Sequence, residues 1–76
     1  SKKLQILLDL NTLDENKVLE ISEIINKFKG EKSITIQVYH EKEKINLSLL
    51  SRKYKIDVSK ELLNKLDSVD LPYLIN

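Results

Sequence analysis

The sequence predicts a small α+β domain in two layers, with two helices packed on one face of a mainly antiparallel sheet. Residues 34–38 and 45–49 alternate apolar with polar side chains, which is the period of a half-buried strand. Residues 18–28 and 62–69 place apolar side chains three and four positions apart, which is the period of an amphipathic helix. With shorter extended segments added, the element order is β-α-β-β-(β)-α-β, which indicates a split βαβ arrangement.

The composition indicates one ordinary domain. The chain has 76 residues and no methionine, so we expect a single domain, residues 1–76, that is a fragment of a much larger polypeptide. It has no cysteine, which excludes disulfides within the chain and cysteine-ligated zinc. Thirteen basic and twelve acidic residues are interspersed and argue against a dedicated nucleic-acid binder. No apolar run approaches the roughly 20 residues that span a bilayer.

The first element is a strand within residues 4–10, where apolar side chains recur at every second position. Leu7 breaks the alternation and is expected on the outer face of the sheet. Asn11 and Thr12 end the strand.

The next element is a helix with a single apolar stripe. The stripe consists of Val18, Ile21, Ile24, Ile25 and Phe28. Two starts are open, because residues 12–15 have the form of a capping box led by Thr12, whereas Asp14 can serve as the N-cap instead. Gly30, the one glycine of the chain, follows the last turn and predicts a left-handed stop there.

A hairpin over residues 32–50 is the centre of the predicted fold. The connecting residues 41–44 are all polar and include no glycine, so a loop built on a type I turn is expected. One face of the hairpin is apolar, and we expect the two flanking helices to cover it. That face carries Ile34, Ile36, Val38, Ile45, Leu47 and Leu49.

The remaining chain predicts a connection, a second helix and a last strand. Residues 51–54 are a polar connection, and residues 55–58 a short extended piece with its apolar side chains inward. Ser59 caps the second helix. Its inner stripe consists of Leu62, Leu63, Leu66 and Val69. Pro72 ends the helical region and is tolerated in a strand at a sheet edge, which residues 72–76 would form.

The residues offer little catalytic chemistry. His40 has no second histidine with which to form a metal site, so a plain surface histidine is the simpler interpretation. Asp9 and Asp57 would form a carboxylate pair if their strands were neighbours; a strand-end acid and a cap is the alternative. A single glycine is too few for a phosphate-binding loop. We therefore expect no catalytic residue, no cofactor and no bound metal.

An apolar strand edge is the first candidate for binding a partner. Tyr73, Leu74 and Ile75 would lie beside an open row of backbone groups, which can accept another chain by strand addition. In the alternative interpretation Leu74 closes the core and Tyr73 is a half-buried ring.

A basic and aromatic group is the second candidate. Arg52, Lys53, Tyr54 and Lys55 combine cations with a ring, as single-stranded nucleic-acid sites do. The acidic residues nearby, and the lack of a further aromatic in that stretch, argue against it.

The chain resembles the C-terminal domain of the alpha subunit of bacterial DNA polymerase III, the replicative polymerase. The similar segments are residues 4–8, 28–30, 33–38 and 45–49, and above all residues 54–66, where an aromatic residue, a valine and a serine cap lead into a helix of the form Glu-Leu-Leu-x-x-Leu. The resemblance covers nearly the whole chain. The chain departs from the family pattern after Leu66, because Ser68, Val69 and Asp70 stand where a glycine often closes the helix.

The resemblance implies a cytoplasmic domain that is not itself catalytic, since the polymerase aspartates of the family lie in a separate palm domain. It also implies attachment, because this region of alpha is where the clamp-loader tau subunit docks in some bacteria. Other replisome proteins and the rest of the polymerase chain are further implied partners. Two alternatives remain: a small single-stranded nucleic-acid-binding module, whose affinity would fall steeply with salt, and a free-standing regulatory or ligand-binding domain that pairs through its sheet edge.

Overall fold

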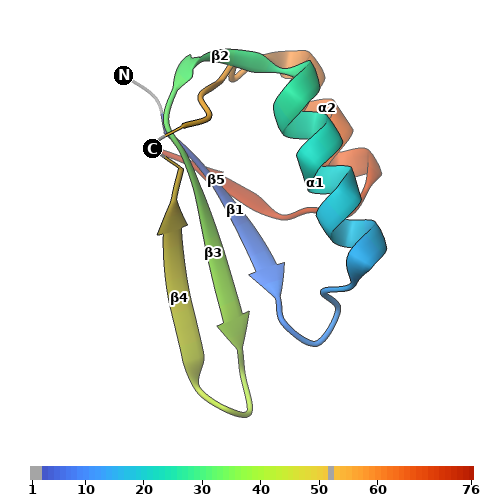
Figure 1. The fold of residues 1–76 in the computed structure, drawn as a ribbon, viewed down its shortest axis with the longest axis vertical. Helices are drawn as coiled ribbons and strands as arrows, with labels where there is room; N and C mark the ends of the chain where they lie inside the picture. Colours follow the sequence, from blue (N-terminus) through green and yellow to red (C-terminus); the bar gives the residue numbers. More distant parts are fainter. Residues whose placement is uncertain (1–2, 52) are drawn as a thin grey trace.

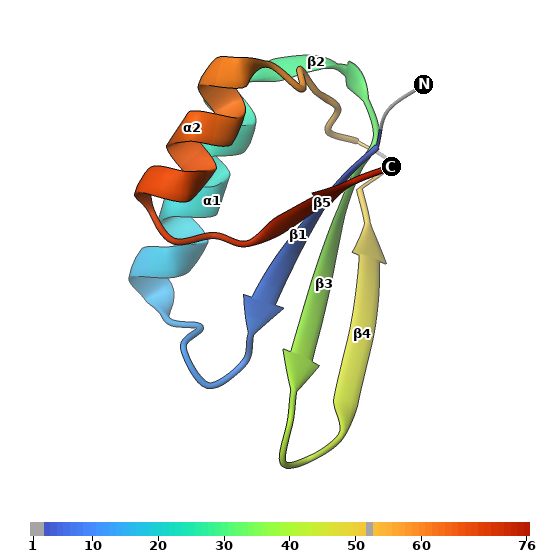
Figure 2. The same ribbon diagram turned by 180° about the vertical axis from the view of Figure 1, so that it is seen from behind.

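The computed structural model describes residues 3–51 and 53–76 and confirms the α+β class (Figure 1). In chain order the elements are β1 (Leu4–Asp9), α1 (Glu15–Lys27), β2 (Lys29–Lys32), β3 (Ile34–His40), β4 (Ile45–Leu50), α2 (Lys60–Ser68) and β5 (Tyr73–Ile75). The sheet has the order β4-β3-β1-β5, with β1 and β3 parallel and both outer pairs antiparallel. Both helices lie on the same side of this sheet when it is seen from the front and from behind (Figure 1 and Figure 2).

The inner face of the sheet, which faces the helices, supplies five of the twelve residues of the buried core. The register places Leu4, Ile6 and Leu8 of β1 beside β3 residues of the same parity, so these side chains share one face. The buried core consists of Leu4, Ile6, Leu8, Ile21, Ile24, Phe28, Ile34, Val38, Ile56, Leu62, Leu66 and Leu71. Neither helix of the described chain has the length and apolarity to cross a membrane.

The outer face of the sheet carries a row of amides across three strands. Gln5 Nε2 on β1 donates to Gln37 Oε1 on β3 at 3.1 Å, and Gln37 Nε2 donates to Asn46 Oδ1 on β4. A polar row of this kind suits a sheet with one face packed on a core and the other toward water.

The start of α1 is settled by its cap. Asp14 is the N-cap, and its Oδ1 accepts a hydrogen bond from the Lys17 N–H at 2.8 Å. The Thr12 hydroxyl instead donates to the Asp9 carbonyl oxygen at 3.1 Å. Of the two expected starts, the one at Asp14 is therefore the one that forms.

The apolar stripe predicted for α1 is partly wrong. Ile21, Ile24 and Phe28 are buried, whereas Val18 is 53% exposed and Ile25 is half-buried. The reason is geometric: with 3.6 residues per turn, positions 18 and 25 fall on the same flank of the helix, beyond the line that contacts the sheet.

The expected left-handed stop at Gly30 is also wrong. The helix ends at Lys27 with Phe28 as its C-cap, and no described glycine has a positive φ. Glycine is required here by a close approach, because a Cβ at residue 30 would lie 2.6 Å from the Cα and the backbone nitrogen of Asp57. The Gly30 N–H donates to the Lys55 carbonyl at 3.2 Å, so β2 is held against the chain that leads to α2.

Helix α2 is capped at both ends. Ser59 is the N-cap, as predicted, and its Oγ accepts from the Leu62 N–H at 3.1 Å. At the other end the Leu71 N–H donates to the Leu66 carbonyl at 2.9 Å and the Asp70 N–H donates to the residue 67 carbonyl at 3.3 Å, the bonding pattern of a Schellman motif. Asp70 occupies its left-handed position, with φ 56°, so an aspartate stands where such motifs usually have glycine.

The hairpin of β3 and β4 projects beyond the helices (Figure 1). Its loop, residues 41–44, ends with Lys44 in the left-handed conformation at φ 55°, which agrees with the expected loop built on a type I turn. The expectation that the helices cover the whole apolar face of the hairpin is wrong for β4, where every residue is exposed. The strand order explains this, since β4 is the outermost strand on the side of β3 away from β1 and β5.

Candidate functional site

The candidate catalytic residues are not brought together. Asp9 ends β1 opposite Tyr39, whereas Asp57 lies against Gly30 at the other end of the domain, so they do not form a pair. The His40 Nδ1 accepts a hydrogen bond from the Glu43 N–H at 3.0 Å and so serves the hairpin loop. In residues 3–51 and 53–76 no group of three His, Cys, Asp or Glu side chains could hold a metal ion.

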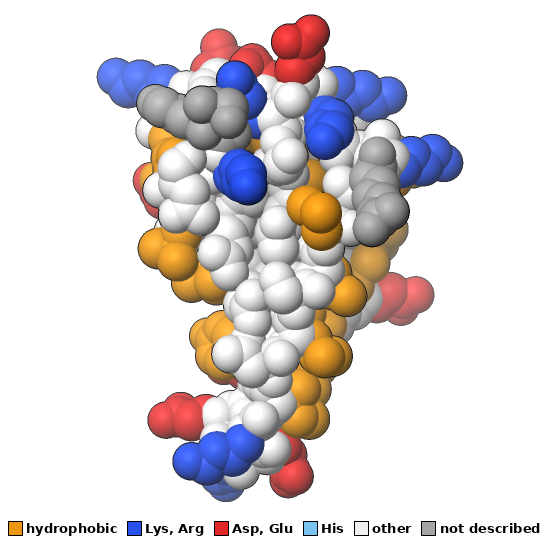
Figure 3. Space-filling view, turned by 90° about the vertical axis from the view of Figure 1, so that its left-hand side faces the viewer, with side chains coloured by type: hydrophobic (Ala, Val, Ile, Leu, Met, Phe, Trp, Pro, Cys, Tyr) orange, Lys and Arg blue, Asp and Glu red, His pale blue; other side chains and the backbone are white. Residues whose placement is uncertain are grey.

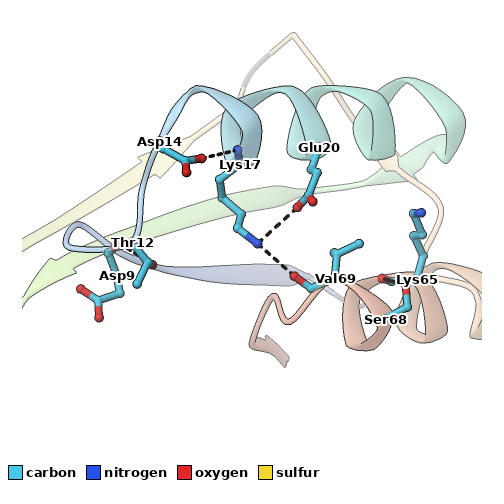
Figure 4. A network of polar contacts seen from close by, with 8 residues as sticks. All are labelled: Asp9, Thr12, Asp14, Lys17, Glu20, Lys65, Ser68 and Val69. Carbon is cyan, nitrogen blue, oxygen red and sulfur yellow. Dashed lines mark hydrogen bonds and ion pairs between the residues drawn. The ribbon is translucent and has the colours of Figure 1, made fainter.

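A network of polar contacts joins the start of α1 to the end of α2 (Figure 4). The Lys17 Nζ donates to the Val69 carbonyl oxygen at 3.0 Å and lies 3.2 Å from Glu20 Oε2. That Glu20 oxygen is shielded from solvent and has this ammonium as its ionic partner, without the alignment of a directed hydrogen bond. A lysine that satisfies a carbonyl at a helix end has a structural role, because it ties the two helices together.

The β5 edge is the first open edge of the sheet. Residues 3 and 76 exchange backbone hydrogen bonds at 3.0 Å, and the Leu7 N–H donates to the Pro72 carbonyl. In an antiparallel pair of strands, every second residue forms its backbone hydrogen bonds with the partner strand. Leu74 therefore directs its N–H and C=O groups toward β1, and Tyr73 and Ile75 direct theirs outward.

The side chains of β5 divide between the two faces. Tyr73 and Ile75 share the inner face with β1 residues 6 and 4, and Tyr73 is half-buried against the core. Leu74 lies on the outer face and is 52% exposed, so it does not close the core. Of the two interpretations of this strand, the half-buried ring is right for Tyr73, and the exposed apolar edge is right for Leu74.

The β4 edge is the second open edge. The Ser51 N–H donates to the Ile34 carbonyl at 3.1 Å, so residues 45, 47 and 49 also direct their backbone toward β3. The N–H and C=O groups that point outward are those of Asn46, Ser48 and Leu50. Leu47 and Leu49 are 56% and 55% exposed on the inner face.

Figure 3 looks onto this side of the molecule. Hydrophobic side chains lie to the left and right of the narrow strand edge, and the hairpin tip below it is charged. Sequence reasoning missed this edge because it assigned the apolar face of the hairpin to the core. The sequence did contain an indication that part of the sheet is exposed. It has only two short amphipathic helices, and these have to cover a sheet of four strands.

The basic group lies near β2. Lys53, Tyr54 and Lys55 are exposed, and Arg52 lies outside the described residues. Lys53, Tyr54 and Lys55 line a shallow hollow, and Lys29 lines it too, which the sequence did not indicate. The Lys53 Nζ sits 5.4 Å from the centroid of the Tyr54 ring and so covers one face of the ring on which a base would stack.

The fold and these surfaces together define a class: a small two-layer α+β domain whose sheet has an open, partly apolar strand at each edge. The family model of the C-terminal domain of the DNA polymerase III alpha subunit matches residues 4–76. The chain therefore belongs to this family of replicative polymerase domains, which confirms the resemblance in its sequence. A search of curated proteins gives no match to the chain.

Proposed function

We propose that this domain is a non-catalytic docking module at the C-terminal end of the bacterial polymerase alpha subunit, where it attaches the polymerase to the clamp-loader tau subunit in the cytoplasm. The 76 residues are then one domain of a much larger chain, and the rest of that chain and other replisome proteins are its further partners. The family match over residues 4–76 is the observation that carries this proposal.

The β5 edge is the proposed docking site. It presents the outward backbone groups of Tyr73 and Ile75, and it presents Leu74 and Ile75 as exposed apolar side chains, 52% and 38% accessible. An extended segment of the partner can add to such an edge by backbone hydrogen bonds while its side chains contact the apolar residues.

Chemical-shift mapping tests the site. When the isotope-labelled domain is titrated with the tau subunit, we expect the shifts to concentrate at residues 73–76 and at the neighbouring residues of β1. Shifts confined to the hairpin tip or to the outer side of α1 would assign the contact elsewhere.

Two substitutions sharpen the test. Ile75→Asp and Leu74→Asp each place a charge on the β5 edge and are expected to weaken tau binding by roughly tenfold or more, as the loss of a central apolar contact does. Leu50→Asp on the opposite edge is the matched control, since Leu50 is as exposed as Leu74. Tyr73→Ala is less informative, because that ring also packs against the core.

A second candidate function is contact with single-stranded nucleic acid at Arg52, Lys53, Tyr54 and Lys55. It is favoured by one observation, the position of Lys29 in the same hollow as Lys53 and Lys55. A titration with a labelled oligonucleotide at rising salt separates the two functions. Steeply salt-dependent binding that Lys53→Ala weakens supports this candidate, whereas a docking module shows little binding.

A further inference from the structure

We infer that β4 is a self-association edge: it pairs antiparallel with β4 of a second copy of this chain, so that two sheets become one continuous sheet. The contact lies on the opposite edge from the proposed tau site and does not depend on that function.

The first support is that β4 lacks the features that usually protect an edge strand. Natural edges are kept apart by short length, by proline, by bulges or by charged side chains in the strand. Ile45–Leu50 contains six residues, none of which is charged, proline or glycine. The whole strand is exposed, and neither helix of the described residues lies over it (Figure 1).

The second support is that the strand is complementary to itself. Its outward backbone groups belong to Asn46, Ser48 and Leu50, which are evenly spaced about Ser48. With the two-fold axis at Ser48, Asn46 of each copy pairs with the second copy's Leu50, and all three outward residues are used. The same register places Leu47 of each copy directly across from Leu49 of the other copy on the inner face, so the contact forms twice. These two leucines are the most exposed side chains on that face of β4.

The third support concerns the ends of the strand. Antiparallel pairing brings the chain that leaves β4, with Lys53 and Lys55, toward the hairpin tip of the second copy, which carries Glu41 and Glu43. Parallel pairing would instead bring Lys53 and Lys55 toward the same two lysines. The tip also carries two lysines, so this complementarity favours an orientation more than it adds affinity.

The expected association is weak and reversible. One strand pair of six residues falls below the roughly 1,200 Å² of a stable protein interface. Self-association should therefore appear as a concentration-dependent equilibrium and not as a permanent dimer.

Sedimentation equilibrium from micromolar to millimolar protein tests the inference, with variants at Ser48. Because the Ser48 N–H points outward, Ser48→Pro removes the central donor of the interface without removing a bond to β3. We expect Ser48→Pro to weaken self-association by about tenfold or more, since each copy loses a donor and leaves a carbonyl unpaired. Ser48→Ala keeps the N–H and is expected to associate like the parent chain.

A second pair of variants keeps the test valid if Ser48→Pro disturbs folding. Leu49→Lys introduces a charge opposite the second copy's Leu47 and should also weaken self-association by about tenfold or more. Leu74→Lys, equally exposed but on β5, should not. A parent chain that stays monomeric at millimolar concentration, or an association that Leu74→Lys abolishes and Leu49→Lys does not, would overturn the inference.

Oxidative cross-linking locates the axis. The chain has no cysteine, so Ser48→Cys introduces a single thiol. Residues paired across the axis have Cα atoms about 5.5 Å apart, within the range of a disulfide. We expect Ser48→Cys to form a covalent dimer faster than Ser68→Cys, whose thiol lies at the end of α2. Equal rates for the two variants, or protection of the β4 amides from hydrogen exchange only when tau is present, would assign this edge to another partner.

Discussion

The two edges of the sheet differ in length, cover and protection. β5 has three residues, follows Pro72 and packs Tyr73 against the core, whereas β4 has six residues that are all exposed. The difference follows from the position of the helices, because α1 joins β1 to β3 and α2 leads into β5. Two amphipathic helices bury one half of this small sheet and leave the other half as surface. The covered half therefore contributes most of the stability, and the uncovered half is available for contacts with other chains.

The largest expected effect contrasts a core residue of the covered half with an exposed residue of β4. Leu66→Ala removes a fully buried side chain of α2 and is expected to lower the free energy of unfolding by about 2–5 kcal/mol. Leu47→Ala should lower it by less than about 1 kcal/mol, because that side chain remains largely in water in the folded domain. Urea unfolding of both variants measures the contrast. Equal losses would show that β4 is buried in solution.

The next effect concerns the close contact between Gly30 of β2 and the segment that connects β4 to α2. Gly30→Ala places a Cβ within 2.6 Å of the Asp57 backbone, so β2 and the segment around Ile56 must move apart. We expect a loss of about 1–3 kcal/mol, as overpacking against backbone produces. Glu31→Ala, one position on and exposed, is the control. An unchanged unfolding midpoint for Gly30→Ala would show that this close approach is not maintained.

A smaller effect is expected at the polar contact between the helices. Lys17→Met keeps the apolar stem but removes the donor to the Val69 carbonyl and the partner of Glu20. The expected loss of stability is about 0.5–1.5 kcal/mol, the usual contribution of one partly exposed hydrogen bond. Thermal unfolding at low and high salt separates the contribution of the ion pair with Glu20 from that of the hydrogen bond to the Val69 carbonyl. Salt weakens the ion pair more than it weakens the hydrogen bond. A large salt dependence would assign most of the effect to Glu20.

Most of the elements could be predicted from sequence because each depends on a local pattern. The exception is β2, Lys29–Lys32, whose four residues are all exposed and show no apolar alternation. The period of two in residues 34–38, the serine cap at Ser59 and the proline before β5 each act within a few residues. The strand order does not follow from such patterns, because it depends on which strands meet in space. The missed exposure of β4 follows from that limit: alternation shows that Leu47 and Leu49 share a face, but not whether a helix lies over that face.

Gly30 shows the same limit in a single residue. Its place after a helix is typical of a left-handed stop, and nothing nearby in the sequence indicates that the backbone of Asp57 packs against it. Conversely, the left-handed position at the end of α2 was hidden because an aspartate occupies it. The candidate site was predictable in part: Leu74 and Ile75 lie at an open edge as the pattern indicated, whereas the outward backbone groups of β4 depend on pairing with β3.

The smallest expected effects compare the backbone just before each edge strand. Lys44 lies before β4 and Asp70 before β5, and both are left-handed residues that are not glycine, with φ of 55° and 56°. Glycine has no side-chain penalty in this conformation, so both replacements by glycine are expected to stabilise the domain, by about 0.5–1 kcal/mol. The gain, measured by thermal unfolding, should be larger for Lys44→Gly, because aspartate tolerates the left-handed region better than lysine does.

Two controls separate conformation from charge in this last comparison. Lys42→Gly lies in the same loop at a residue without a positive φ, so it should destabilise the domain slightly through the greater freedom of the unfolded chain. Asp70→Asn keeps a residue that tolerates the left-handed region but removes a negative charge at the C-terminal end of α2, which the helix dipole disfavours. If Asp70→Asn stabilises the domain as much as Asp70→Gly does, the electrostatic contribution and not the backbone conformation limits stability at the start of β5. If neither changes the unfolding midpoint while Lys44→Gly raises it, then the left-handed backbone lowers stability at Lys44 and not at Asp70.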